Sequence, residues 1–166
     1  AARNLISGNR NAGLEILDAG STGNLVVGNF SGTDVTGAAA LGNWDPSFGG
    51  DGIRFSGTAP TGNTIGGTTD TARNVISGNG RHGVGIWHNQ SDRTVVQGNI
   101  IGLSPDGTRR LANRKHGVDM NFGASETLVG GTGPRWRHVV PGHHEPARQA
   151  AMTRRARCVP SNPPAH

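Results

Sequence analysis

The chain has 166 residues, of which 28 are glycine, and its formal net charge is +5. This much glycine argues against a helical bundle, because a glycine inside a helix costs about 1 kcal/mol relative to alanine. The sequence contains no run of about 18 apolar residues that could cross a membrane, and Cys158 is its single cysteine, which excludes a disulfide scaffold.

The positive charge is confined to the C-terminal part of the chain. Residues 1–132 hold nine Arg and one Lys against eight Asp and two Glu, whereas residues 133–166 hold six Arg against one Glu. A basic arm of this kind can bind nucleic acid, but the body has no basic stripe, and we expect no nucleic-acid partner. We predict a repeat body over 1–132 and a Pro- and Arg-rich tail over 133–166, which begins as a decayed repeat and is then disordered or poorly structured.

The body consists of related units in tandem. The segment 3–9, Arg-Asn-Leu-Ile-Ser-Gly-Asn, recurs at 73–79 as Arg-Asn-Val-Ile-Ser-Gly-Asn. The shorter phrase Asn-x-(Ile/Val)-x-Gly has Thr in place of Asn in two copies. The starts at Asn24, Asn63, Thr94 and Thr127 are separated by 39, 31 and 33 residues, which gives the lengths of three units. The longest unit carries extra residues around Trp44 to Gly50.

Each unit is expected to form short β-strands separated by glycine–asparagine turns. The phrase Gly-apolar-x-apolar begins at Gly13, Gly52, Gly83 and Gly117, and apolar residues at spacing two indicate a half-buried strand. Glycine and asparagine tolerate positive φ, which suits sharp corners between strands. Because one unit cannot bury its own apolar face, we predict that the units stack on one another, with repeated asparagines forming side-chain amide ladders.

This ordered pattern of turns and strands resembles the right-handed parallel β-helix of the pectate-lyase-like superfold, as found in large bacterial secreted and surface proteins. The resemblance covers residues 3 to about 132. It implies an all-β solenoid of about three to four coils. A β-sandwich or a propeller is the alternative architecture, and the unequal unit lengths argue against a propeller.

That superfold hosts lyases, hydrolases, adhesins and passive stalks, so the resemblance alone does not decide the function. We expect a non-catalytic structural or adhesive segment of a secreted or cell-surface bacterial protein, which packs against neighbouring coils of a longer parent chain and contacts polysaccharide. The alternative is a fragment of a polysaccharide lyase or glycoside hydrolase. We expect no cofactor.

Stacking places equivalent residues of successive units in columns about 4.8 Å apart. When the four Gly-apolar-x-apolar phrases are aligned, polar and aromatic residues gather beside and between the apolar positions. The candidate saccharide-binding face consists of Asp51, Arg54, His82, Trp87, His116, Asp119 and Asn121. An aromatic ring can pack on a sugar, and Arg with carboxylates can hold its hydroxyl or uronate groups.

Two other interpretations of this face remain. Asp51, His82 and His116 could form an acid/base cluster or a metal site, or the face could be an ordinary solvated surface. Enzymes of the superfold use clustered acidic calcium ligands with an arginine, or Asn-Thr-Asp, Asp-Asp and Gly-His-Gly in order. This sequence has no Asp-Asp pair, and Arg81-His82-Gly83 and Lys115-His116-Gly117 match Gly-His-Gly only in part. We therefore predict no catalytic residues and no metal ligands.

Overall fold

The computed structural model describes residues 3–58, 60–87, 93–121, 126–130 and 157–158. Within these residues the regular structure is almost entirely β, with one short 3₁₀-helix, η1 (Asp70–Ala72). The strands are β1 (Leu5–Ile6), β2 (Leu14–Leu17), β3 (Leu25–Val26), β4 (Phe30–Ser31), β5 (Ile53–Ser56), β6 (Thr64–Gly66), β7 (Val75–Ile76), β8 (Val84–Trp87), β9 (Val95–Gln97), β10 (Ile100–Ile101), β11 (Val118–Asn121), β12 (Leu128–Val129) and β13 (Arg157–Cys158). No helix in the described ranges is long and apolar enough to span a bilayer.

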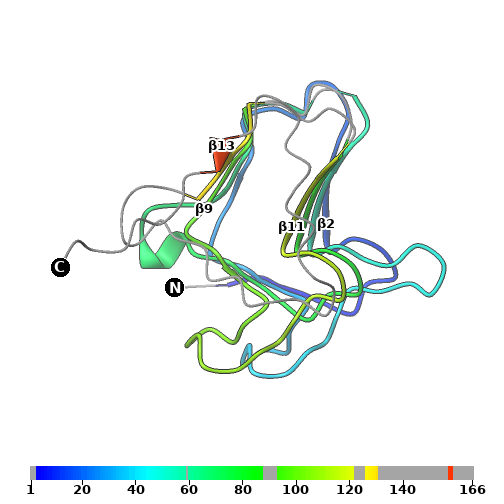
Figure 1. Cartoon of the computed structure of the whole chain (residues 1–166), viewed down its shortest axis with the longest axis vertical. Helices are drawn as coiled ribbons and strands as arrows, with labels where there is room; N and C mark the ends of the chain where they lie inside the picture. Colours follow the sequence, from blue (N-terminus) through cyan, green and yellow to red (C-terminus); the bar gives the residue numbers. More distant parts are fainter. Residues whose placement is uncertain (1–2, 59, 88–92, 122–125, 131–156, 159–166) are drawn as a thin grey trace.

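The strands form three parallel sheets that the chain visits in a fixed order. Sheet A has the order β1-β4-β7-β10, sheet B the order β11-β8-β5-β2, and sheet C the order β13-β12-β9-β6-β3. Each passage through sheets A, B and C, which we call a coil, adds one strand to each sheet, and β1 to β12 make four coils. Viewed along the stack, the three sheets outline a triangle around a filled interior (Figure 1). Parallel pairing contradicts the antiparallel sandwich and propeller alternatives.

The register between coils is the one that the repeated phrases predict. Leu14 pairs with Ile53, Ile53 with Val84, and Val84 with Val118. In sheet C, Thr64 pairs with Leu25 and with Val95, which confirms the predicted unit starts. The most similar segments, 3–9 and 73–79, lie two coils apart, because β4 separates β1 from β7 in sheet A.

The inward-facing residues of all three sheets form one apolar core. Phe55, Ile86 and Met120 stack in sheet B, while Ile65 and Ile76 enter from sheets C and A. A second, smaller cluster consists of Phe30, Val75, Ile100 and Leu103. Buried and partly exposed residues alternate along β5, so apolar residues at every second position are enough to fill the interior.

Asparagine ladders run along the corners, as predicted. One ladder links the side chains of Asn9, Asn43, Asn79 and Asn113, with Nδ2 to Oδ1 distances of 2.8, 2.9 and 2.9 Å. A second links those of Asn4, Asn29, Asn74 and Asn99. Corner glycines let the coils approach: a Cβ at Gly83 would lie 2.6 Å from the Gly117 carbonyl oxygen and 2.9 Å from Asn113 Nδ2.

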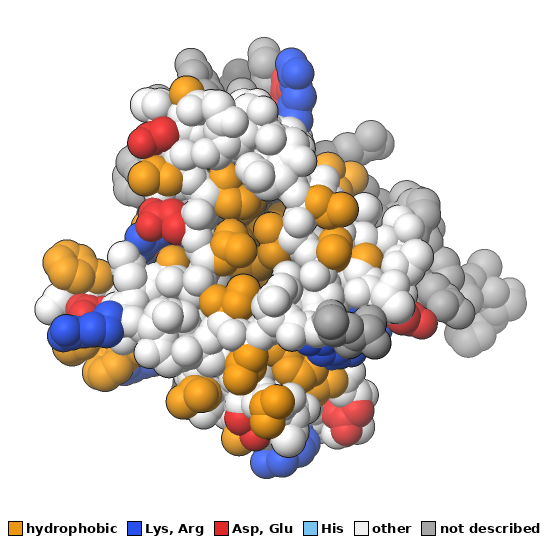
Figure 2. All heavy atoms as spheres, turned by 180° about the vertical axis from the view of Figure 1, so that it is seen from behind, with side chains coloured by type: hydrophobic (Ala, Val, Ile, Leu, Met, Phe, Trp, Pro, Cys, Tyr) orange, Lys and Arg blue, Asp and Glu red, His pale blue; other side chains and the backbone are white. Residues whose placement is uncertain are grey.

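The first coil exposes apolar surface. Leu5, Leu17 and Leu25 are all exposed, and an open depression of about 490 Å³ is lined by residues 14–17 and 24–26, together with Ser21. On the face seen in Figure 2, hydrophobic side chains gather around a central hollow.

The predicted tail lies outside the described residues apart from Arg157–Cys158. These two residues form β13, which extends sheet C by pairing in parallel with Leu128 and Val129 of β12.

Candidate functional site

The seven residues of the predicted face lie in or directly before the strands of sheet B. Asp51, His82 and His116 occupy the corner residue two positions before β5, β8 and β11 respectively. The other four lie within these strands: Arg54 in β5, Trp87 in β8, and Asp119 and Asn121 in β11. Parallel pairing sets Asp119 opposite Gly85 and Asn121 opposite Trp87, so the columns expected from the sequence exist.

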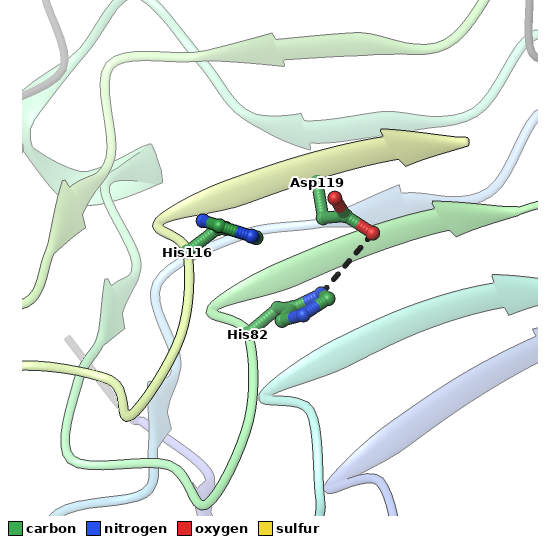
Figure 3. Close-up of side chains that lie close together, drawn as sticks. All are labelled: His82, His116 and Asp119. Carbon is green, nitrogen blue, oxygen red and sulfur yellow. Dashed lines mark ion pairs between the residues drawn. The ribbon is translucent and has the colours of Figure 1, made fainter. Parts of the chain in front are cut away.

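Three side chains of this face, those of His82, His116 and Asp119, lie close to one another. His82 Nδ1 lies 3.3 Å from Asp119 Oδ2, and the two imidazole rings have their centroids 5.1 Å apart. In Figure 3 the two rings come from neighbouring corners and lie on the same side of the strands as the Asp119 carboxylate. His82 is buried, whereas His116 and Asp119 are half-exposed, so solvent reaches the outer part of the group.

Asp51 occupies the same corner position as His82, one coil earlier. Its Oδ1 accepts a hydrogen bond from the His82 backbone N–H at 3.1 Å and lies 3.9 Å from His82 Nδ1. Its Oδ2 is buried and has no hydrogen-bond partner among the described residues. Burial raises the pKa of the Asp51 carboxyl, and the His82 N–H bond and the charges of Arg81 and Arg54 oppose this rise.

Trp87, the last residue of β8, packs against this group. Its indole Nε1–H donates to Asp119 Oδ2 at 3.0 Å, and the Arg81 guanidinium lies over its ring, 4.3 Å from the centroid. Gly85 makes this packing possible, because a Cβ there would lie 3.3 Å from Trp87 Cε2 and Nε1 and from Asp51 Oδ2. The Trp87 ring therefore serves as an internal wall of the group.

The interpretation as a wholly solvated face is wrong for two of the residues. Asp51 is 0% and His82 is 3% exposed, because the Trp87 ring and the next coil cover the corner. Arg54 contacts both neighbouring coils, because its Nε lies 3.0 Å from Glu15 Oε1 and its guanidinium lies 5.6 Å from the centroid of the Trp87 ring. The hydrogen bond from Arg54 holds the pKa of Glu15 below its ordinary value.

A second feature was missed by the sequence reasoning. An open groove of about 740 Å³ adjoins the corner, and its lining includes residues 44–49, Gly80, Arg81, Arg114 and Lys115. Its walls are the connections from sheet A to sheet B in the second, third and fourth coils. The available signal was the extra length of the 39-residue unit around Trp44 to Gly50.

Arg81 connects the two features. It lines the groove and also lies over the Trp87 ring. The residues that follow Arg81 and Lys115 in sequence are His82 and His116. The groove and the histidine–aspartate group are therefore neighbouring parts of one surface.

The arrangement offers two kinds of chemistry. Two imidazoles beside a carboxylate supply the nitrogen and oxygen donors of a transition-metal site, or a set of acid/base groups. Exposed aromatic rings beside guanidinium and ammonium groups suit an anionic ligand that has an apolar face.

Comparisons of the chain with protein-family models, with curated proteins and with solved structures gave no match. A fold alone does not define an activity. The candidate function therefore depends on the geometry of these side chains.

Proposed function

We propose that the chain is a segment of a right-handed parallel β-helix of the pectate-lyase-like kind, from a secreted or cell-surface bacterial protein. The cyclic order of the three parallel sheets supports a solenoid. Right-handedness is the strong preference of connections between parallel strands. The exposed Leu5, Leu17 and Leu25 of the first coil support packing against a neighbouring coil.

The proposed role is structural or adhesive, with an acidic polysaccharide bound in the groove. The observation that carries this proposal is the lining itself, which combines two exposed aromatic rings with three cationic side chains. Trp44 is 47% and Phe48 is 75% exposed, and Arg81, Arg114 and Lys115 lie on the neighbouring coils. A sugar ring packs on an aromatic face, and Arg forms bidentate hydrogen bonds with a carboxylate.

Residues of the third and fourth coils hold the Trp44 ring of the groove in place. The Trp44 ring packs directly on Gly80, where any side chain would collide with it, and the Arg114 guanidinium lies 5.9 Å from the centroid of the Trp44 ring. The single carboxylate of the lining, Asp45, is turned into its own loop, because it accepts from the backbone N–H groups of Ser47 and Phe48. The groove therefore presents cations to a ligand.

This assignment moves the saccharide site away from the face that the sequence indicated. The indole N–H of Trp87 is bound to Asp119, and Arg81 covers its ring. Trp44 and Phe48 offer more open aromatic surface than Trp87 does.

The test is a binding titration of the full chain with oligogalacturonate and with a neutral glucan of the same length. We expect the acidic polymer to bind and the neutral one to bind weakly or not at all, with affinity falling as salt rises. Trp44→Ala and Arg114→Ala should each weaken binding. Arg93→Ala, which removes an exposed arginine outside the groove, serves as the matched control. Equal binding of both polymers, or no binding to either, contradicts the proposal.

The second candidate is a fragment of a polysaccharide lyase or glycoside hydrolase. It is favoured by the titratable group of His82, His116 and Asp119, which adjoins the groove at Arg81. Release of unsaturated or reducing ends from pectin-like polymers, lost in Asp119→Asn, would support it. Binding without any release supports the adhesive role.

A further inference from the structure

The group of His82, His116 and Asp119 has the composition of a metal site. Each residue contributes one ligand atom, and the three atoms lie within 4.8 Å of one another. In a tetrahedral zinc site with Zn–N and Zn–O distances near 2.1 Å, neighbouring ligand atoms are about 3.4 Å apart. The distance from His82 Nδ1 to Asp119 Oδ2 is already 3.3 Å, so only small side-chain rotations separate this arrangement from a coordinating one.

We propose that His82, His116 and Asp119 bind a divalent transition-metal ion, with Zn²⁺ as the representative. Two imidazole nitrogens and one carboxylate oxygen are ligands that Zn²⁺ accepts. The ion would join the third coil to the fourth, because His82 precedes β8 and the other two ligands belong to the β11 segment.

Asp51 is the independent observation that points to a cation. Its carboxylate is buried, and Oδ2 has no hydrogen-bond partner among the described residues. The His82 N–H and the charges of Arg81 and Arg54 offset part of the cost of burying this carboxylate, and a cation beside it would offset more. Asp51 Oδ1 also accepts from the His82 backbone N–H and lies 3.9 Å from His82 Nδ1, so Asp51 positions this ligand residue from outside the coordination sphere.

The surroundings support three ligands with an open coordination position. The Trp87 indole N–H donates a hydrogen bond to Asp119 Oδ2. A hydrogen bond of this kind, from a residue that does not itself bind the metal, orients a ligating carboxylate. His116 and Asp119 are half-exposed, so an ion can enter from solvent and retain a water molecule. In the first coil the corner residue is Ala12, and within the described ranges the donor set was found between the third and fourth coils.

The test uses the full chain, stripped of metal with a chelator and then titrated with Zn²⁺. Because the other histidines, His88, His138, His143, His144 and His166, could also bind zinc, the readout is the ring nitrogen resonances of His82 and His116 in two-dimensional NMR. We expect these resonances to shift together and to saturate at a single equivalent of zinc. Titration with Co²⁺ should give the visible absorption of a tetrahedral nitrogen and oxygen site.

Variants separate metal binding from folding. His116→Ala and Asp119→Asn change half-exposed side chains and should remove saturable binding at this site without unfolding the metal-free chain. Asp51→Asn should weaken the affinity by about 10–100-fold. Asp70→Asn, which removes an exposed carboxylate outside sheet B, should leave the affinity unchanged. His82 and His116 resonances that do not respond to Zn²⁺, or wild-type affinity in His116→Ala, would overturn the proposal.

Discussion

The side-chain amide of Asn79 donates a hydrogen bond to Oδ1 of Asn113 at 2.9 Å, which links the third coil to the fourth inside the corner. Asn79 Oδ1 in turn accepts from Asn43 Nδ2 at 2.9 Å. The side-chain oxygen of each member therefore accepts from the side-chain amide of the preceding coil. The coils are fixed in register by these polar contacts as well as by the apolar core.

The ladder predicts an unequal cost of removing its members. Asn79→Ala leaves the buried amide of Asn43 and the buried oxygen of Asn113 each short of a partner, so we expect a loss of roughly 1–3 kcal/mol in the free energy of unfolding. Asn9→Ala, at the exposed end of the same ladder, should cost less. Chemical denaturation measures both variants, and equal losses would contradict the unequal cost that the ladder predicts.

Two phenylalanines provide a matched test of the core. Phe55 is 0% exposed, and Phe55→Ala should lower the free energy of unfolding by about 3–5 kcal/mol because it opens a cavity. Phe48 is 75% exposed in the groove wall, and Phe48→Ala should change stability by no more than about 0.5 kcal/mol. Thermal and denaturant unfolding compare the two. A similar loss in both variants would contradict the assigned interior.

The stacking register could be predicted from the sequence, and the detail of the site could not. The phrase Gly-apolar-x-apolar recurs once per coil, so aligning its copies also aligns Leu14, Ile53 and Val84, which the structure pairs. Burial of Asp51, by contrast, depends on how the Trp87 ring folds over Gly85. That packing is a property of side-chain directions in three coils and leaves no periodic signal.

The groove was equally inaccessible to sequence reasoning. Trp44 occupies the position after the ladder asparagine, where the next two coils have Gly80 and Arg114, and Phe48 lies in the extra residues of the long unit. The approach of the Trp44 ring to Arg114 spans from the second coil to the fourth. Repeat alignment reports what the units share, and this contact arises from what one unit does not share.

We predict that the Asp106 carboxyl has a pKa well below the usual range for aspartate. Hydrogen bonds from Ser104 Oγ–H and from Thr108 lower the pKa of the Asp106 carboxyl from its ordinary 3.8 to about 2. Because the folded state favours the charged form, this contribution to stability is complete above the ordinary pKa and is lost as the pH falls toward 2. Carbon-detected NMR titration measures the value directly.

A single variant tests the cause of that shift. Ser104→Ala should raise the pKa of Asp106, because the hydroxyl hydrogen bond is the largest contribution. Asp34, in the corresponding loop of the second coil, has its pKa lowered mainly by Thr36 and should not respond. An unchanged Asp106 titration in Ser104→Ala would show that the hydroxyl is not responsible.

A side chain at position 85 is expected to disturb the packing of the Trp87 indole against Asp51 and Asp119. Gly85→Ala would place a methyl group 3.3 Å from Asp51 Oδ2 and from two atoms of the Trp87 ring, which is tighter than an ordinary contact. We expect the Trp87 indole N–H resonance to shift as its bond to Asp119 lengthens. Gly107→Ala meets no neighbouring atom within 4 Å and should leave that resonance in place, although positive φ at Gly107 makes it a strained variant too. An unmoved Trp87 signal in Gly85→Ala would contradict the packing described.

The central functional claim is that an acidic saccharide lies between the aromatic rings and the cations of the groove. The most direct measurement is an NMR titration of the full chain with oligogalacturonate, followed at the Trp44 indole N–H and the Arg114 guanidinium. We predict that these two signals shift most and saturate together, while the Arg93 guanidinium stays unchanged. No saturable shift, or shifts confined to residues outside the groove, would contradict the claim.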